Sequence, residues 1–316
     1  TLGGGIGWLG GKHGATVDNL ISADVVTADG RLLTASASEN PDLFWALRGG
    51  GGNFGVVTTF TFRCHQVANV LAGPVLYAME DAAEVLAWYR DFIGEAPEEL
   101  GGFFAFLSVP PGPPFPEELH LRKVCGVVWC STGDEDAPAL KAARSFGTPL
   151  LDGIAPMPFP VWNSAFDGVY PAGDQWYWRA DFVDSIPDAA IEKHVEFGAA
   201  MPTWKSTMHL YPIDGAPSRV SEDSTAWAYR DANWAQVMVG VDPDPANAEA
   251  IKAWAIDYWD ALHPFSLGGA YVNFMMDEGQ ERVQATYRGN YERLAKVKAQ
   301  YDPGNFFHVN QNIRPG

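Results

Sequence analysis

Alternation of apolar and polar residues with a period of two predicts short β-strands at the start of the chain. Residues 20–26 and 32–34 show this pattern on either side of the turn Ala28-Asp29-Gly30, which predicts a hairpin. Residues 56–62, rich in Val, Thr and Phe, predict a further strand. Between them, residues 40–47 begin near a proline and end at four consecutive glycines, which predicts one short helix.

The rest of the chain mixes two periods and so predicts both strands and helices. Apolar stretches predict strands at 70–79, 103–109, 121–129, 204–211, 235–241 and 271–274. Apolar positions at helical spacing predict helices at 81–92, 134–146, 188–200, 245–262 and 280–300, the last closed by a turn at 301–305. This order is typical of an α+β fold in which helices cover one face of an antiparallel sheet.

Composition and charge narrow the class of partner. The chain has 316 residues, enough for one large domain or two ordinary ones, and 13% of them are aromatic, which suits a deep core or a pocket for a flat molecule. A formal net charge of -18 argues against binding to nucleic acid or to anionic membranes. No apolar run is long enough to span a bilayer. We therefore expect a soluble protein acting on a small molecule, in a compartment that the sequence leaves open, cytoplasmic or secreted.

The cysteines do not indicate a metal site. Cys64, Cys125 and Cys130 form no CxxC pair and have no neighbouring histidine at the spacing of metal ligands. We expect buried thiols and no bound metal.

Two glycine-rich stretches, residues 3–14 and 49–52, suggest a cofactor. Gly5-Ile6-Gly7-Trp8-Leu9-Gly10 matches the dinucleotide fingerprint GxGxxG, but residues 10–14 are a poor helix, and the fingerprint requires a helix there. Glycines 49–52 form the second stretch, and four successive glycines are costly in backbone entropy. Close approach of a ligand to the backbone would explain both stretches, so a pyrophosphate site of another kind stays open beside simple tight turns.

The order of these motifs resembles a known family. The first part carries, in sequence order, Gly3-Gly4-Gly5-Ile6-Gly7, Val17-Asp18-Asn19-Leu20, Val25-Val26-Thr27-Ala28-Asp29-Gly30-Arg31, and the run from Asn40-Pro41-Asp42 through Gly52-Asn53-Phe54-Gly55. The end carries Tyr271-Val272-Asn273-Phe274, Tyr301-Asp302-Pro303-Gly304-Asn305-Phe306-Phe307 and Asn310-Gln311-Asn312-Ile313. These motifs resemble the berberine-bridge-like oxidases, whose FAD-binding domain is of the vanillyl-alcohol-oxidase or PCMH type.

The resemblance implies a domain plan and a cofactor. Residues 1–67 would be the C-terminal part of the FAD-binding domain, 68–270 a substrate domain, and 271–316 a closing segment that returns to the FAD domain. FAD would lie between the two domains. The residues expected near it are Gly3, Gly4, Gly5, Gly7, Asn19, Gly52, Asn53, Gly55, Val57, Tyr271, Asn273, Asn310 and Asn312. The His and Cys that bind flavin covalently in this family are expected upstream of the chain, and His13 is expected to be a loop histidine, so the chain alone is an incomplete cofactor site.

The resemblance also implies chemistry, with two departures. Family members pass a hydride from substrate to flavin while a base takes a proton, and O2 reoxidises the flavin. Gln236 stands at the family's Glu position and has no basic group. Phe274 stands at the family's Tyr position and has no hydroxyl. His209 and Tyr211 lie two apart on one predicted strand, hence on one face, and are alternative candidates for the base. Local packing is the other interpretation of this pair.

Three functions therefore compete. The first is an FAD-linked oxidase of an alcohol, a sugar or a secondary-metabolite ring. The second is a flavin-family protein that has lost oxidase activity and binds a small molecule, which Gln236 and Phe274 favour. The third, a nicotinamide dehydrogenase, rests on GxGxxG alone. Trp162, Trp176, Trp178 and Trp204 would suit the floor of an aromatic or sugar site, or a core.

Overall fold

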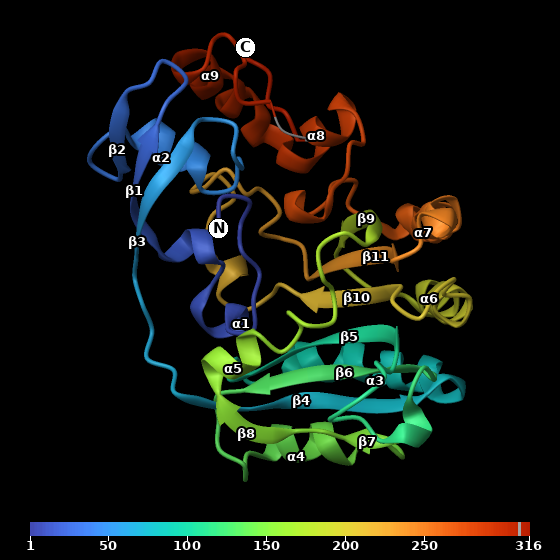
Figure 1. Ribbon diagram of the computed structural model, residues 1–316. Coiled ribbons are helices and arrows are strands. Elements are labelled where there is room, and N and C mark those ends of the chain that lie inside the picture. Colours follow the sequence, from blue (N-terminus) through green and yellow to red (C-terminus); the bar gives the residue numbers. More distant parts are fainter. Residues whose placement is uncertain (309–310) are drawn as a thin grey trace. The chain divides into compact units, whose positions relative to one another are not determined.

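The chain divides into two compact units. The computed structural model describes residues 1–308 and 311–316 (Figure 1). Unit 1 comprises Thr1–His65, Ile213–Asn233 and Leu267–Gly316, and unit 2 comprises Gln66–Pro212 and Trp234–Ser266. The segment Ile213–Asn233 falls inside the range expected for a substrate domain, and it belongs to unit 1.

Unit 1 contains a small antiparallel sheet. Its strands are β1 (Leu20–Val26), β2 (Leu32–Ser36) and β3 (Val56–Phe62), in the order β2-β1-β3. The predicted hairpin is present, with its turn closed by a hydrogen bond from the Gly30 amide to the Thr27 carbonyl. Helix α2 (Pro41–Leu47) follows, with every residue from Leu43 to Leu47 buried.

The C-terminal part of unit 1 differs from the sequence prediction in two places. Residues 271–274 are not a strand, because Val272–Phe274 form a 3₁₀ turn. The single helix predicted at 280–300 is two helices, α8 (Gln280–Tyr287) and α9 (Tyr291–Tyr301). Arg288 interrupts them with a φ of 47°, outside the helical region. One turn of helix that the sequence did not predict, α1 (Gly10–His13), lies in the first glycine-rich stretch.

Unit 2 is built on an eight-stranded antiparallel sheet (Figure 1). Its strands are β4 (Asn69–Ala78), β5 (Leu100–Ser108), β6 (Lys123–Ser131), β7 (Leu151–Asp152), β8 (Ala155–Pro158), β9 (Gln175–Val183), β10 (Thr207–Pro212) and β11 (Trp234–Asp242). They are ordered β7-β4-β6-β5-β10-β11-β9, with β8 also paired to β4. Strand β9 was not predicted.

Helices pack on one face of this sheet, and the main core lies between them and the strands. They are α3 (Ala82–Glu95), α4 (Pro138–Ser145), α6 (Asp188–Ala199) and α7 (Ala248–Leu262). Phe104, Phe106, Met208 and Leu210 reach this core from alternate positions of β5 and β10. The predicted α+β class, with helices over one face of an antiparallel sheet, is confirmed.

Short elements complete the two units. Helix α5 spans Phe159–Asn163, and the remaining 3₁₀ turns are Thr16–Asn19, Met79–Asp81, Glu117–Leu119, Pro217–Arg219, Pro245–Asn247, His263–Phe265 and Arg288–Asn290. Among the described residues, no helix combines the length and apolar character needed to cross a membrane.

Candidate functional site

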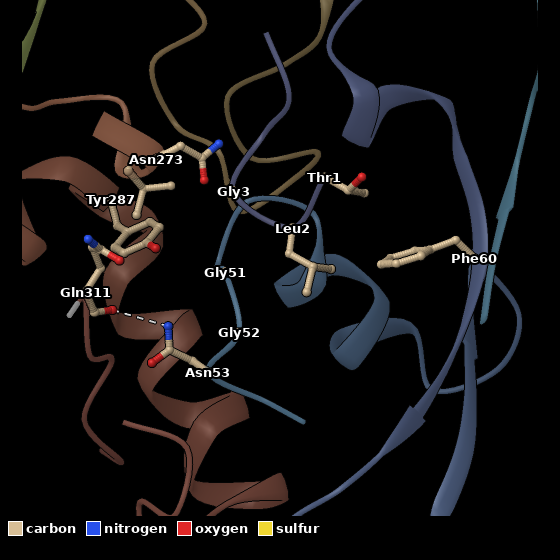
Figure 2. A pocket seen from close by; sticks show the side chains of 11 residues that line it. Thr1, Leu2, Gly3, Gly51, Gly52, Asn53, Phe60, Asn273, Tyr287 and Gln311 are labelled. Atoms are coloured by element: carbon tan, nitrogen blue, oxygen red, sulfur yellow. Dashed lines mark hydrogen bonds between the residues drawn. The ribbon is translucent and has the colours of Figure 1, made fainter. Parts of the chain in front are cut away.

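A cavity of about 400 Å³ in unit 1 brings the two glycine-rich stretches together. Figure 2 shows Gly3 of the first stretch and Gly51 and Gly52 of the second on its wall. The full lining is Thr1, Leu2, Gly3, Gly51, Gly52, Asn53, Phe60, Val272, Asn273, Tyr287 and Gln311. None of these side chains is charged. A volume near the lower end of the usual range for ligand pockets, roughly 300–1,000 Å³, suits part of a large cofactor.

The first glycine stretch is held by the closing segment of the chain. The phenol oxygen of Tyr271 accepts hydrogen bonds from the Gly5 amide (2.6 Å) and the Ile6 amide (3.1 Å), and a third from Asn273 Nδ2 (2.6 Å). A Cβ on Gly3 would lie 2.2 Å from Asn273 Oδ1, so only glycine fits there without a shift. Tyr271 and Asn273, both expected near the cofactor, thus position the backbone of the loop.

The second glycine stretch is hydrogen-bonded to Leu2, the residue directly before the first stretch. The amides of Gly49 and Gly51 both donate to the Leu2 carbonyl, at 2.9 and 3.0 Å. Asn53 then joins this stretch to the end of the chain. Its Nδ2 donates to the carbonyls of Gly50 (2.8 Å) and Gln311 (3.2 Å), and its Oδ1 accepts from the Ile313 amide (3.0 Å).

A buried ion pair between Lys298 and Asp302, which we call the Lys298 clamp, holds the backbone of Asn53. Lys298 Nζ donates to the carbonyls of Asn53 (2.7 Å) and Phe307 (2.6 Å) and to Asp302 Oδ2 (2.6 Å). Both side chains are almost fully shielded from solvent. Asp302 also accepts from the Phe306 and Phe307 amides, and these bonds with Lys298 keep its pKa below the usual range although burial opposes them. The clamp therefore fixes the wall of the cavity that Asn53 forms.

The cavity collects some of the predicted cofactor residues and leaves others aside. Gly3, Gly52, Asn53 and Asn273 line it, whereas Gly4, Gly5, Gly7, Asn19, Gly55, Val57, Tyr271 and Asn312 do not. Asn19 braces the loop, since its Nδ2 donates to the carbonyls of His13 and Ala15. Asn310 lies outside the described residues.

Sequence reasoning missed six lining side chains, namely those of Thr1, Leu2, Phe60, Val272, Tyr287 and Gln311. Gln311 stands inside a motif that the family resemblance had already singled out. Nothing in the sequence around Tyr287 pointed to a pocket.

The segment Ile213–Asn233 contributes an anchor to the loop around Asp18. Arg230 makes a two-pronged ion pair with Asp18, with Nη1–Oδ2 at 2.9 Å and Nη2–Oδ1 at 2.7 Å. The arginine side chain is 3% exposed, and a buried bidentate pair of this kind fixes geometry strongly. Asp18 is thus a structural brace within unit 1.

A second group of polar side chains lies on the sheet of unit 2. His209 Nδ1 and the Tyr211 hydroxyl are 2.6 Å apart. Their strand neighbours Met208 and Leu210 belong to the core under the helices, so His209 and Tyr211 lie on the opposite face. The Phe103 ring flanks both, with centroid distances of 4.7 and 4.9 Å. The structure thus brings the two predicted residues together.

Burial keeps both members of this pair neutral. Desolvation lowers the pKa of His209 to about 4. Desolvation, with a smaller contribution from Tyr170, raises the pKa of the Tyr211 phenol. At pH 7 the imidazole is therefore unprotonated and the phenol protonated, and they share one hydrogen bond.

Gln236 does not join the pair, and Phe274 belongs to the other unit. Gln236 is aligned with Leu210 on one side and with Asp181 on the other, so it faces the helices. It is 2% exposed, and its Nε2 has no hydrogen-bond partner among the described residues. Phe274 is in unit 1, where its ring packs edge-to-face on Tyr271 at 4.9 Å. Within unit 2, Gln236 therefore lies on the face opposite to His209.

Two of the four tryptophans considered for a substrate site lie on the face of the sheet that carries His209. Trp176 and Trp178 lie on β9 with ring centroids 5.7 Å apart, and the strand register puts them on the face that carries His209. Tyr170 packs on Trp176 at 5.3 Å. Trp162 is buried, and Trp204 is 36% exposed beneath the Lys205 ammonium. Aromatic rings therefore share the face of the sheet that carries the His209–Tyr211 pair, and this face offers stacking surfaces.

Comparison with known proteins gives relatives along the whole chain. A family profile described as "Berberine and berberine like" matches residues 270–314. An FAD-linked oxidoreductase of Dictyostelium discoideum is 29% identical over 100% of this chain and 67% of its own length. The uncharacterized FAD-linked oxidoreductase YgaK of Bacillus subtilis is 30% identical over 100% and 69%. The xylooligosaccharide oxidase of Thermothelomyces thermophilus is 28% identical over 100% and 67%.

Solved structures agree on the fold. The wild-type BBE-like 1 protein of Physcomitrella patens has a TM-score of 0.83 at 21% identity, covering 100% of this chain and 69% of its own. A chitooligosaccharide oxidase has a TM-score of 0.81 at 22% identity, covering 100% and 70%. Since YgaK is 30% identical across the entire chain, the sequence relationship extends beyond the shared fold. The chain belongs to the berberine-bridge-enzyme-like family of FAD-linked oxidoreductases.

Proposed function

We propose that this FAD-linked oxidoreductase is an oxidase that takes a hydride from an alcohol, a sugar or a secondary-metabolite ring and passes the electrons to O2. Support for the substrate class comes from relatives named as oxidases of xylooligosaccharides and chitooligosaccharides. The aromatic face around His209 and Tyr211 also suits a ring-shaped molecule, because flat rings stack on aromatic side chains.

We assign part of the FAD site to the cavity of unit 1. Its walls fit such a ligand, since backbone of two glycine-rich stretches borders it and uncharged amide side chains reach it. Gly3, Gly51 and Gly52 would lie against FAD through their backbone, with Asn273 and Gln311 beside them. When bound, FAD supplies the hydride acceptor and returns the electrons to an oxidant.

The hydrogen bond between His209 and Tyr211 is the observation that carries the proposed chemistry. In either tautomer the pair keeps one acceptor for a substrate proton. When His209 Nδ1–H donates to the Tyr211 phenol, His209 Nε2 accepts the substrate proton. When the phenol instead donates to Nδ1, the phenol oxygen accepts the substrate proton while the phenol's own proton moves to the imidazole. Since burial disfavours the imidazolium, we expect the proton to leave the substrate together with the hydride and not before it.

Oxygen consumption by the purified protein, extended upstream of Thr1 and supplied with a panel of sugars and alcohols, tests this function. We expect turnover, and we expect Tyr211→Phe and His209→Gln to lower kcat by about 10²–10⁴-fold while the visible flavin spectrum stays unchanged. Because the pKa of His209 is lowered to about 4, the acid limb of kcat/KM should lie near pH 4 and not near 6.5. Full activity in both variants would remove the pair from the mechanism.

The alternative is a flavin-family protein that binds a small molecule without oxidising it. The absence of a hydroxyl at Phe274 favours this candidate, since the family position carries a tyrosine. A protein that is yellow, binds members of the panel and consumes no oxygen with any of them would establish the alternative.

A further inference from the structure

We propose that the hydroxyl of Tyr287 donates a hydrogen bond to FAD in the unit 1 cavity, as a residue that positions the cofactor. This inference rests on the assignment of that cavity to FAD. It concerns a side chain that sequence reasoning did not single out.

The position of Tyr287 is the first observation. It is the last residue of α8, directly before the break at Arg288, and it lines the cavity. In Figure 2 its ring lies between Asn273 and Gln311, with the hydroxyl toward Gly51. Tyr287 is 2% exposed, and its hydroxyl oxygen is itself shielded from solvent.

The hydrogen-bond inventory of the lining is the second observation. The Tyr287 hydroxyl has no partner among the described residues. The amide groups beside it are already engaged, because Asn273 Nδ2 donates to the Tyr271 hydroxyl at 2.6 Å and Gln311 Nε2 donates to the Met275 carbonyl at 2.8 Å. Asn53 Nδ2 likewise donates to two backbone carbonyls. The phenol is therefore a shielded donor, without a partner in the described part of the chain, in a residue of the cavity wall.

Energetics explain why a ligand is the natural partner. A buried hydroxyl without a hydrogen bond costs about 1–3 kcal/mol, and phenylalanine would avoid that cost with the same ring. Burial raises the pKa of Tyr287, so the group is a neutral O–H donor at any physiological pH. It therefore needs an acceptor, and FAD offers carbonyl, ring-nitrogen and phosphoryl acceptors.

Tyr77 supplies a matched control. Its hydroxyl is also buried without a partner among the described residues, but it lies in the core of unit 2 and does not line the cavity. Both Tyr→Phe changes remove the same atom from a similar environment. Only the change at Tyr287 should affect the cofactor.

The experiment uses the protein extended upstream of Thr1, and compares its Tyr287→Phe and Tyr77→Phe variants with the unchanged protein. All are prepared as apoproteins from riboflavin-starved cells. Thermal unfolding should show both variants to be at least as stable as the unchanged apoprotein, because each loses an unpaired polar group. Titration with FAD, followed by quenching of flavin fluorescence, should show about tenfold weaker binding for Tyr287→Phe alone, as expected for one lost hydrogen bond.

Two outcomes overturn the inference in distinguishable ways. Equal affinity of Tyr287→Phe and the unchanged protein for FAD would refute the role of Tyr287 while leaving the cofactor site in place. Failure of the unchanged protein itself to bind FAD would refute the assignment of the cavity, and the inference would fall with it.

Discussion

Gln236 lies under the helices of unit 2 beside another buried polar residue. It is aligned directly with Asp181 of β9, which is 0% exposed and whose carboxylate is 3.1 Å from His263 Nδ1. Gln236→Glu would place a second carboxylate next to this one, and burying a like charge is costly. We expect the free energy of unfolding in urea to fall by about 1–3 kcal/mol or more. Gln236→Met, which removes the unpaired amide at similar volume, should leave stability unchanged or raised; equal stability of the Glu variant would contradict this placement.

Gln236 also shows that the sequence did not predict which face of its strand a residue occupies. The family resemblance selected its position along the chain, but the face of a strand depends on register, and a shift of one residue reverses it. His209 and Tyr211 were paired correctly because two residues of one strand, two apart, share a face whatever the register. Tyr287 was missed because the residues that line the cavity with it, such as Asn273 and Gln311, are 14 and 24 positions away, and no local pattern reveals them.

The second glycine stretch carries a prediction at the level of the element. Gly49 has a φ of +130°, and a Cβ there would lie 2.2 Å from the Trp227 amide nitrogen. Gly49→Ala should therefore lower the unfolding temperature sharply, by the equivalent of more than about 2 kcal/mol. Gly52 has no such φ, and a Cβ there would meet nothing within 4 Å, so Gly52→Ala is the control and should unfold like the unchanged protein. A Gly49→Ala variant as stable as its control would show that the loop relaxes freely.

Periodicity located the elements of unit 2 better than those near the end of unit 1. Strands β4, β5, β6, β10 and β11 carry long apolar runs, whereas β9 was missed because Arg179 and Asp181 interrupt its pattern. The break between α8 and α9 depends on tertiary contacts. Arg288 Nη1 lies 2.6 Å from Asp231 Oδ1, and its guanidinium lies 3.7 Å from the Tyr229 ring centre. These partners come from the segment Ile213–Asn233, whose place in unit 1 no helical pattern indicates.

On the scale of the whole molecule, buried histidines make stability depend on pH. His194 is 1% exposed, contacts the Tyr258 hydroxyl at 2.8 Å, and has its pKa lowered by desolvation to about 3. In the unfolded chain it takes a proton near pH 6.5, whereas the folded chain takes one only near pH 3. The contribution of His194 to stability is therefore constant above about pH 6.5. It falls as the pH drops from there toward 3, by roughly 1.4 kcal/mol per pH unit.

Urea unfolding between pH 6.5 and 4.5 measures this slope above the range where most carboxylates titrate. His194→Gln should reduce the slope of unfolding free energy against pH by the contribution of this histidine, roughly 1.4 kcal/mol per pH unit. His209, with its pKa lowered to about 4, would continue to contribute in the same direction. An unchanged slope in the variant would mean that His194 is protonated in the folded protein.

The Lys298 clamp has a consequence for chemical labelling. The Lys298 side chain is fully shielded from solvent, so reagents that acylate lysines will not react with it in the folded protein. Modification becomes possible only when α9 separates from the loop at Asp302, and a reagent in excess then records each opening irreversibly. The rate of Lys298 acylation, followed by mass spectrometry, therefore measures how often unit 1 opens locally. The measurement needs no cofactor, substrate or turnover.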